Sequence, residues 1–271
     1  MKKKLIKIKE FKSYQFIRKI WFFYLYEIGF NIKKLFRKIV KCKEYEKLKS
    51  LHNTHMNERC FIIATGPSMT MDDLKKLNNE ITFGMNSLCR VFVEIGWETT
   101  YFAIQDKSVY KKMYEDLGKL STTKLFVSDD NNDISQIKSN LFRYPLNIYN
   151  HKTVTDKFIY KFSDSICDEV SAGFTIAYSA LQIAIYMGFK EIYLLGCDCS
   201  YVDDKEKRHF IETGHYDPNY KTIGDKMIDA YKVAKQYADD HNIKIYNATR
   251  GGKLEVFERV DLDDILMQRN D

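Results

Sequence analysis

The feature that most constrains this chain is a run of apolar residues that passes directly into a small-residue turn. Phe61-Ile62-Ile63-Ala64 is followed by Thr65-Gly66-Pro67-Ser68. An apolar run without polar alternation is typical of a strand that is buried on both faces, as in a parallel sheet. A helix is predicted to begin near Thr70, and the N–H groups and dipole of a helix N-terminus favour an anion. The stretch therefore predicts either an anion site or an ordinary strand–turn–helix junction.

The charge of the chain is distributed unevenly. The 271 residues carry a formal net charge of +6. Residues 1–50 hold 16 Lys and Arg against 4 Asp and Glu, so this segment alone carries +12 and the rest carries −6. A nucleic-acid-binding fold needs its basic patch on the folded body, so nucleic acid is not an expected partner. The six cysteines have no framework spacing and are interpreted as reduced thiols of a cytoplasmic protein.

Residues 1–55 form a basic and aromatic leader. Its apolar centre, residues 20–30, is too short to span a bilayer and contains Glu27. No small-residue cleavage site follows it, which argues against a signal peptide. From Ile32 to Val40, apolar residues recur at helical spacing with Lys and Arg between them, a pattern typical of an interfacial membrane helix. The leader therefore predicts attachment to the anionic inner face of the plasma membrane. Packing on the body or a homo-oligomer contact is the alternative.

Strands and helices alternate through residues 56–271, which are expected to form one nucleotide-binding α/β domain. This alternation predicts a Rossmann-like, doubly wound and mainly parallel sheet. Residues 132–168 are expected to be either a lid or a long connection, and residues 199–220 a polar active-site loop. Strands are expected within 61–64, 81–85, 101–104, 124–127, 192–195 and 243–246, and helices within 71–77, 107–117, 174–187 and 222–240.

Polar or glycine residues follow most of the predicted strands. The carboxyl ends of parallel strands share one edge, where ligands bind, so the pattern predicts a ligand site there. The chain has no G-x-G-x-x-G, Walker, H-E-x-x-H or G-x-S-x-G motif. It therefore does not favour a dinucleotide enzyme, a P-loop NTPase, a zinc peptidase or an α/β-hydrolase. The strand-end residues are Thr65–Ser68, Asn86–Ser87, Gln105–Asp106, Gly196–Asp198 and Asn247–Arg250.

The order of these motifs resembles the 6-hydroxymethylpterin diphosphokinase-like domain family, which also occurs in motility-associated-factor flagellin glycosyltransferases. The resemblance covers residues 58–260 and excludes the leader. The motif order is also similar to that of bacterial CMP-sialic-acid-dependent sialyltransferases, which implies a glycosyltransferase-A-like variant of the sheet. In those enzymes the matching residues hold the CMP donor. The residues to which the resemblance gives this role are Thr65, Gly66, Pro67, Ser68, Asn86, Gln105, Ser171, Gly173, Gly196 and Asp198.

The same resemblance implies a histidine as general base. His215 is the nearest match to the second His of the family's H-Y-x-G-H-S loop, and His209 is the other candidate. The two are six residues apart instead of four. Glu169 also stands where those enzymes have an Arg, and Ser200 where they have a nucleotide-contacting Tyr, so sialic acid is not fixed as the sugar. No D-x-D motif stands where a metal-dependent glycosyltransferase would need it, so no metal site is expected.

The favoured function is a glycosyltransferase that moves a sugar, such as a nonulosonic acid, from a nucleotide-sugar co-substrate to a surface-glycan or lipid-linked glycan acceptor. CMP is the favoured nucleotide, and no cofactor is obligatory, although Mg²⁺ is an optional addition. One alternative is a pterin pyrophosphoryl transferase that uses ATP and Mg²⁺. A second is a non-catalytic nucleotide-binding module of a glycan-assembly complex. The sequence leaves open the sugar, the acceptor, the stereochemistry and the oligomeric state.

Overall fold

The protein is built around a parallel β-sheet. The computed structural model describes residues 12–39, 43–129, 140–152, 158–201, 209–211 and 220–268. Within them, eight strands form one sheet in which every pair of neighbours is parallel. The prediction of an α/β fold with a parallel sheet is therefore confirmed, and the sheet is wholly instead of mainly parallel. The glycosyltransferase-A-like assignment stays a prediction.

Six of the described strands lie close to their predicted positions, and four others were not predicted from the sequence. The main sheet contains β1 (Arg59–Ile63), β2 (Thr82–Met85), β3 (Tyr101–Ile104), β4 (Lys124–Ser128), β5 (Leu141–Tyr144), β8 (Glu191–Leu195), β9 (Lys244–Asn247) and β10 (Glu258–Arg259). A separate pair contains β6 (Leu146–Asn147) and β7 (Val170–Ser171).

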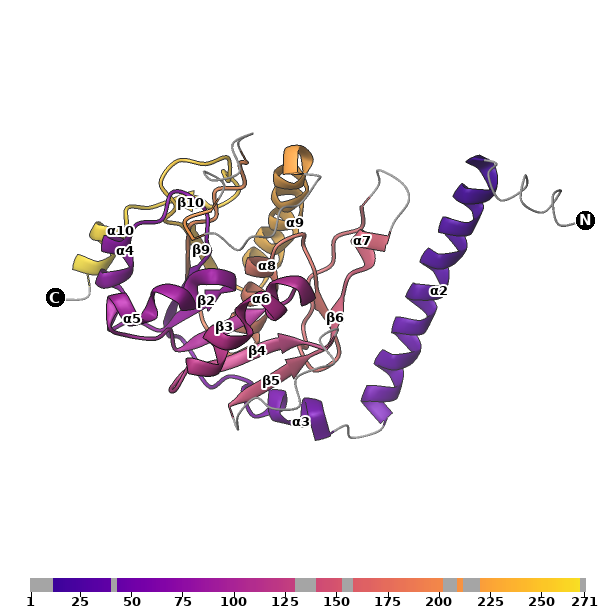
Figure 1. Cartoon of the computed structure of the whole chain (residues 1–271), viewed down its shortest axis with the longest axis horizontal. Helices are drawn as coiled ribbons and strands as arrows, with labels where there is room; N and C mark the ends of the chain where they lie inside the picture. The colour runs from indigo at the N-terminus through magenta and orange to yellow at the C-terminus, as the bar shows by residue number, and fades with distance from the viewer. Residues whose placement is uncertain are drawn as a thin grey trace, which may run out of the picture.

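The described helices flank the sheet on both faces, except for one long helix at the edge of the molecule (Figure 1). They are α2 (Lys12–Ile39), α3 (Lys43–Lys49), α4 (Met71–Lys76), the 3-10 helix η1 (Asn86–Val91), α5 (Phe92–Ile95), α6 (Lys107–Lys119), α7 (Tyr149–Lys152), α8 (Ile176–Tyr186), α9 (Tyr220–Asp240) and α10 (Leu262–Met267).

The strand order reverses at the middle of the sheet. The order is β10-β9-β8-β1-β2-β3-β4-β5, so the chain runs outward from β1 to β5, returns to β8 beside β1, and then runs outward on the other side. The β1–β8 pair is in register from Arg59 opposite Glu191 to Ile63 opposite Leu195, so the two strands end together. In an open parallel sheet, the crevice at such a reversal is where ligands bind.

Two hydrophobic clusters hold the helices against the sheet. Ile62 faces a cluster that includes α8 and α9, whereas Phe61 and Ile63 face a cluster that includes α4, α6 and α10. All three side chains are fully buried, as an apolar run without alternation predicts. Figure 1 shows the two helical layers around the sheet, with α2 as a long helix beside α7 at one edge of the molecule.

Residues 132–168, expected to be irregular, contain regular structure where they are described. β5 adds an edge strand to the main sheet beside β4, and β6 and α7 follow it. Three of the four side chains of β5 are only partly buried, so it lacks the continuous apolar signal of the inner strands. Neither the lid nor the domain limits at residues 55 and 56 is tested by this architecture.

The leader prediction can be compared with α2. The described part of the leader is helical, with a 28-residue helix and the short α3. Among the described residues, no helix combines the length and the apolar character that crossing a membrane requires.

Candidate functional site

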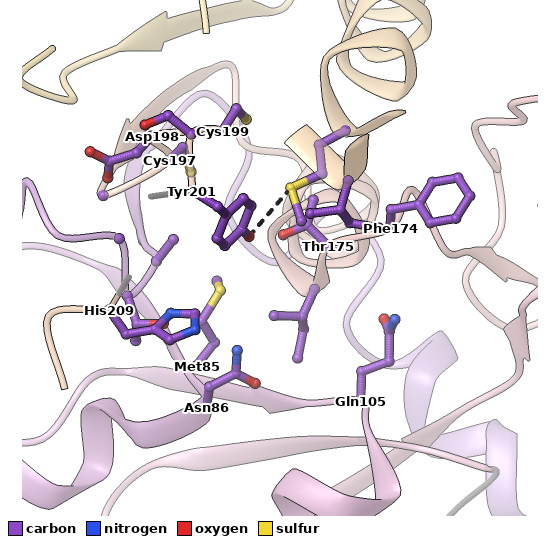
Figure 2. Close-up of a pocket in the computed structure, with 18 of the residues that line it drawn as sticks. Met85, Asn86, Gln105, Phe174, Thr175, Cys197, Asp198, Cys199, Tyr201 and His209 are labelled. Carbon is purple, nitrogen blue, oxygen red and sulfur yellow. Dashed lines mark hydrogen bonds between the residues drawn. The ribbon is translucent and has the colours of Figure 1, made fainter. Parts of the chain in front are cut away.

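A cavity lies at the carboxyl ends of the central strands. Its volume is about 260 Å³, just below the roughly 300–1,000 Å³ of typical ligand pockets. The loops that follow β1, β2, β3 and β8 line it, together with the N-terminus of α8 and one side of α9. Figure 2 shows Asp198, Tyr201 and His209 on one side of this cavity, and Gln105 and Phe174 on the other. The cavity thus occupies the point where the strand order reverses.

The backbone that surrounds the cavity adopts left-handed torsions at several non-glycine residues. Asn86, Phe174 and Cys199 have φ values of 52°, 62° and 50°. Asn tolerates this region, but a bulky Phe rarely enters it, and each such residue costs on the order of 1–3 kcal/mol. All three line the cavity. Strain of this kind is concentrated at binding and catalytic sites, where the surrounding structure enforces it.

The turn after β1 packs directly on the turn after β8. The Gly66 N–H donates to the Gly196 carbonyl at 3.0 Å, and the Ser68 hydroxyl donates to Asp198 Oδ2 at 2.8 Å. A Cβ at position 66 would overlap both the Asp198 carboxylate and the Gly196 carbonyl, so only glycine fits. Gly196 itself has a φ of 64°. The small-residue turn is therefore needed for the close approach of two strand ends.

Asp198 is a buried acid at the centre of this contact. It is 7% exposed, and burial raises the pKa of its carboxyl group, although the hydrogen bonds from Ser68 oppose that rise. Because the ionised form is penalised by burial, a polar partner in the cavity would relieve part of that cost. A ligand hydroxyl that donates to this carboxylate would be such a partner.

The anion site expected at the helix after the turn is already occupied by protein groups. Thr70 caps α4, and Asp73 N–H donates to the Thr70 hydroxyl at 3.2 Å. Asp73 is in turn ion-paired with Arg250. α8 also has its own N-cap, because the Ala177 N–H donates to the Thr175 hydroxyl at 3.3 Å, but its N-terminus lies at the cavity, where Thr175 and Ile176 both line the wall. The dipole of α8 therefore favours an anion in this cavity.

Two polar side chains reach the cavity from the ends of β2 and β3. Asn86 begins η1, and its left-handed torsion turns the chain immediately after β2. Gln105 follows β3, and Ser179 of α8 donates to its Oε1 at 2.6 Å. The Ser128 hydroxyl donates to the Gln105 carbonyl at 2.8 Å. These bonds fix the Gln105 amide against the wall of the cavity.

His209 lies on the cavity because its neighbours are tied to the sheet. The Phe210 N–H donates to the Thr65 carbonyl at 2.9 Å, and Ser87 donates to the Ile211 carbonyl at 2.6 Å. Both bonds connect residues 209–211 to strand-end loops of the site. Residues 202–208 and 212–219 are outside the described residues, so His215 cannot be compared with the cavity.

The structure brings together eight of the eleven predicted site residues that it describes. They are Thr65, Gly66, Pro67, Asn86, Gln105, Gly196, Asp198 and His209.

The other three predicted residues lie outside the cavity lining. Ser68 does not line the cavity, and its hydroxyl donates a hydrogen bond to the Asp198 carboxylate. Ser171 donates its N–H to Gln182 at 2.9 Å and its hydroxyl to Glu169 at 3.2 Å, in the contact region of α2. Gly173 packs so closely on α8 and α9 that a Cβ would overlap Tyr178 and Ala230. Ser171 and Gly173 therefore hold the approach to α8 in this structure, without lining the cavity themselves.

Several lining residues were not predicted from the sequence. Phe174 and Thr175 follow the predicted Ser-Ala-Gly element directly, so proximity to that motif could have identified them. Tyr201 donates its hydroxyl to the Met227 sulfur at 3.7 Å, a contact between the loop and α9 that the sequence does not signal (Figure 2). His151 comes from α7 and packs against Phe174 with its ring tilted by 44° and 4.6 Å between ring centroids.

The two cysteines of the cavity behave as buried neutral thiols. Burial raises the pKa of Cys199 to about 12, and it raises the pKa of Cys197 as well. Tyr231 donates to the Cys197 sulfur at 3.8 Å. Both thiols therefore stay protonated at neutral pH, which makes them poor nucleophiles and poor metal ligands.

Comparison with known proteins gives a family and a fold. The family model described as 6-hydroxymethylpterin diphosphokinase MptE-like matches residues 32–204. No curated protein sequence matches the chain. Among solved structures, the chain is similar to the MAf glycosyltransferase from Magnetospirillum magneticum AMB-1, with a TM-score of 0.51 and 14% sequence identity. The match covers 81% of this chain but 37% of that protein, so this chain corresponds to just over a third of it.

Proposed function

The chain belongs to the 6-hydroxymethylpterin diphosphokinase MptE-like family, and from that premise we propose that it is a glycosyltransferase. It takes a sugar from a nucleotide-sugar donor, with CMP as the favoured nucleotide, and transfers it to a hydroxyl of a glycan acceptor. The likeness of its fold to a MAf glycosyltransferase supports a transferase of this kind.

The observation that carries the proposal is the cavity at the strand-order reversal, with strained backbone on three of its walls. Asn86, Phe174 and Cys199 are held in left-handed torsions around it. Asparagines elsewhere in the described residues share these torsions, but the two such residues that are neither Gly nor Asn, Phe174 and Cys199, both line the cavity, and strain of this kind is concentrated at functional sites. The polar groups and the α8 N-terminus give the cavity the donors that a phosphate and a ribose require.

Each wall has a role in the proposed donor complex. The N-terminus of α8 at Thr175 and Ile176 favours the phosphate. The Asp198 carboxylate accepts a hydrogen bond from a ribose or sugar hydroxyl, which offsets the cost of its burial. Asn86 and Gln105 present amides that can bond a pyrimidine ring or the sugar. The cysteines contribute small apolar surface between these groups.

The acceptor hydroxyl needs a base, and a loop histidine suits this task near neutral pH. Of the two candidates, His209 is supported by its position in the cavity lining. His215 remains a proposal that follows from the resemblance alone. A base contributes about 10²–10⁴-fold to the rate, so its loss should greatly slow transfer while it leaves donor binding near normal.

The test is a donor screen in which products are detected by mass spectrometry. The wild-type protein and the variants His209→Ala and His215→Ala are each incubated with CMP-, UDP- and GDP-linked sugars and a glycan acceptor. We expect transfer from a CMP-linked sugar and its loss in His209→Ala with unchanged nucleotide affinity. Full activity in both variants would contradict the assignment of a loop histidine as the base.

The family name gives a specific reason for a second candidate function, pyrophosphoryl transfer from ATP to a pterin. That reaction needs Mg²⁺, and ATP and a hydroxymethylpterin are therefore included in the same screen, with and without the metal. Formation of a pterin diphosphate would replace the proposed function. Nucleotide binding without any product would instead favour a non-catalytic module of a glycan-assembly complex.

A further inference from the structure

Helix α2 carries a stripe of large apolar side chains that faces away from the body. Trp21, Leu25, Ile28, Ile32, Leu35 and Ile39 are between 55% and 72% exposed. They follow one another at intervals of four and three residues, which places all of them on one face of the helix. We call this face the outer stripe. A run of exposed apolar residues this long marks an interaction surface.

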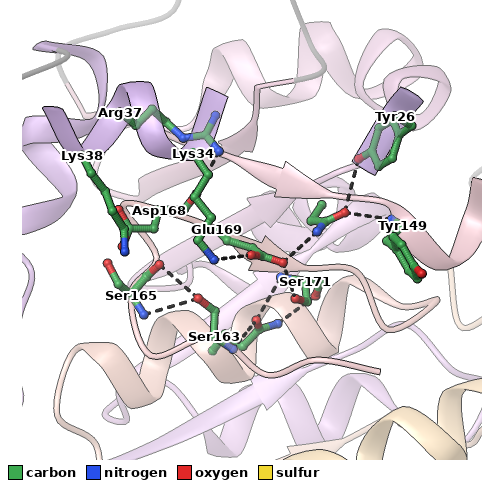
Figure 3. Close-up of polar contacts among 12 residues, drawn as sticks. Tyr26, Lys34, Arg37, Lys38, Tyr149, Ser163, Ser165, Asp168, Glu169 and Ser171 are labelled. Atoms are coloured by element: carbon green, nitrogen blue, oxygen red, sulfur yellow. Dashed lines mark hydrogen bonds and ion pairs between the residues drawn. The ribbon is translucent and has the colours of Figure 1, made fainter. Parts of the chain in front are cut away.

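The opposite face of α2 is fastened to the body, so the direction of the outer stripe is fixed. Tyr26 accepts a hydrogen bond from the Ile148 N–H at 3.0 Å. Lys34 pairs with the buried Glu169 at 2.6 Å, and Arg37 donates to the Asp168 carbonyl at 2.9 Å (Figure 3). These residues are eight and three residues apart, close to whole turns of the helix, so they share its inner face. The helix cannot rotate its apolar stripe toward the body without breaking them.

The charge of this part of the chain identifies what covers the stripe. Residues 1–50 carry +12, so a second copy docked through α2 would bring two strongly basic segments together. An anionic lipid surface instead attracts Lys and Arg, and each basic residue near it strengthens binding several-fold. Trp21 and Tyr24, both more than half exposed, are side chains that favour the headgroup region. From Trp21 to Ile39 the stripe extends about 27 Å, long enough to lie in the plane of a leaflet.

We propose that α2 is a two-faced membrane anchor, in which the inner face holds the α/β body and the outer stripe inserts into an anionic lipid surface. The helix lies flat at the boundary between headgroups and acyl chains, as amphipathic interfacial helices do. The inner-face bonds then orient the whole body relative to the membrane. An isolated amphipathic helix on a flexible tether would give no such orientation.

This orientation brings the cavity close to the lipid surface through α7. Phe23 of α2 packs on Tyr149 of α7, with 4.5 Å between ring centroids. Two residues farther along, His151 lines the cavity and packs against Phe174. One helical turn therefore separates the anchor from the cavity wall. The next step, and no other, rests on the proposed transferase function. If that function holds, the acceptor is a lipid-linked glycan that is presented at the same surface.

Flotation of the full chain with lipid vesicles tests the anchor. Vesicles of phosphatidylcholine alone are compared with vesicles that also contain phosphatidylglycerol. The test variant is Ile28→Glu combined with Leu35→Glu on the outer stripe. The control is Val93→Glu, because Val93 of α5 is 89% exposed on the body. We expect the wild type and the control to bind the anionic vesicles, and the double variant to bind at least about tenfold more weakly.

Three results would overturn the inference. The first is that the wild type does not bind anionic vesicles, and the second is that the double variant binds them as tightly as the wild type does. The third is that the wild type is a dimer in light scattering, that the double variant is a monomer, and that neither protein binds vesicles. The last result would make a second copy the occupant of the stripe. CMP binding is measured on the same proteins without vesicles. Failure of nucleotide binding with intact flotation would count against the proposed function only, and loss of flotation with intact nucleotide binding against the anchor only.

Discussion

Gly66 is the residue at which the two halves of the sheet meet. Its hydrogen bond to Gly196 and its contact with Asp198 leave no room for a side chain. The same closeness brings Ser68 within bonding distance of Asp198. The site is therefore built from backbone proximity at least as much as from side-chain chemistry.

Substitution of this glycine should be costly. Gly66→Ala forces a methyl group against the Asp198 carboxylate and the Gly196 carbonyl, and we expect a loss of about 1–3 kcal/mol in the free energy of unfolding. The control is Gly118→Ala in the last turn of α6, where a Cβ meets nothing within 4 Å. That change should leave stability unchanged or raise it by about 0.4–1 kcal/mol. Urea unfolding measures both, and equal stability of the two variants would contradict the packing described for the turn.

At neutral pH, the buried Asp198 carboxylate should lower the free energy of unfolding, whereas it should strengthen the binding of a nucleotide. Burial raises its pKa, so the folded protein binds this proton more tightly than the unfolded chain. The contribution of this group to stability is therefore largest at acidic pH and falls as the pH rises through the raised pKa. Asp198→Asn should not lower the melting temperature at neutral pH, whereas it should weaken nucleotide binding about tenfold or more.

The matched control is Asp72→Asn, because the Asp72 side chain is 84% exposed and its pair with Lys75 lies at the surface. It should alter neither quantity measurably. Thermal unfolding and calorimetric titration with nucleotide are compared for the two variants. A large drop in the melting temperature of Asp198→Asn alone would show that the carboxylate stabilises the fold.

Residue patterns in the sequence predict which residues stand at the strand ends better than they predict the conformation of the loops. Asn86, Gln105 and Asp198 could be found because each directly follows a recognisable buried strand. The left-handed torsions of Phe174 and Cys199 could not, because the tertiary structure imposes them on residues that do not favour them. Ser171 was expected at the site and instead lies in the hydrogen-bond network below α2.

At the scale of elements, α2 and the segment that ends at β7 behave as one unit. Lys34 pairs with Glu169, and Glu169 also accepts hydrogen bonds from Asn147 at 2.7 Å and from Ser171 (Figure 3). The Ser171 backbone is held in turn by Gln182 of α8. Helix α2 is thus connected to the helix whose N-terminus lines the cavity.

This network makes a prediction for acid stability. Burial alone would raise the pKa of Glu169, but bonds from Lys34 and Asn147 outweigh it, and the folded-state pKa lies below the ordinary 4.5. The stabilisation is therefore complete above that ordinary value and is lost as the pH falls through the lowered one. In Glu169→Gln, the free energy of unfolding should fall less steeply over this window than in the wild type. Urea unfolding across the acid range measures both slopes.

The control for this experiment is Glu46→Gln, because Glu46 pairs with Lys49 within the same short helix and 39% of its side chain is exposed. The free energy of unfolding of this variant should fall with decreasing pH as steeply as that of the wild type. Identical slopes for Glu169→Gln and the wild type would mean that the pair with Lys34 contributes nothing to the docking of α2.

Edge elements are the part of the fold that sequence patterns predict least well. The inner strands were found because both of their faces are buried and their residues are continuously apolar. β5 pairs with β4 only on one side, keeps Arg143 among its four residues, and precedes Pro145. Its strand character comes from that pairing, which no local pattern reveals.

At the scale of the whole molecule, the strand order explains why one cavity gathers residues from so many loops. The alternation of strands and helices predicts a parallel sheet, but it does not tell which strands are neighbours. The order places β8 beside β1, and so joins Gly196 and Asp198 to the opening turn across more than a hundred residues of chain. Because β8 lies beside β1, the strand–turn–helix junction after β1 forms one wall of the proposed nucleotide site.

The most direct test of this account is calorimetric titration of the full chain with CMP, CDP, UDP, GDP and ATP, each with and without Mg²⁺. The account predicts that CMP binds in the absence of metal, and that Asp198→Asn weakens this binding while Asp72→Asn does not. Binding of ATP that requires Mg²⁺, with no response to CMP, would contradict it. So would the absence of binding by every nucleotide.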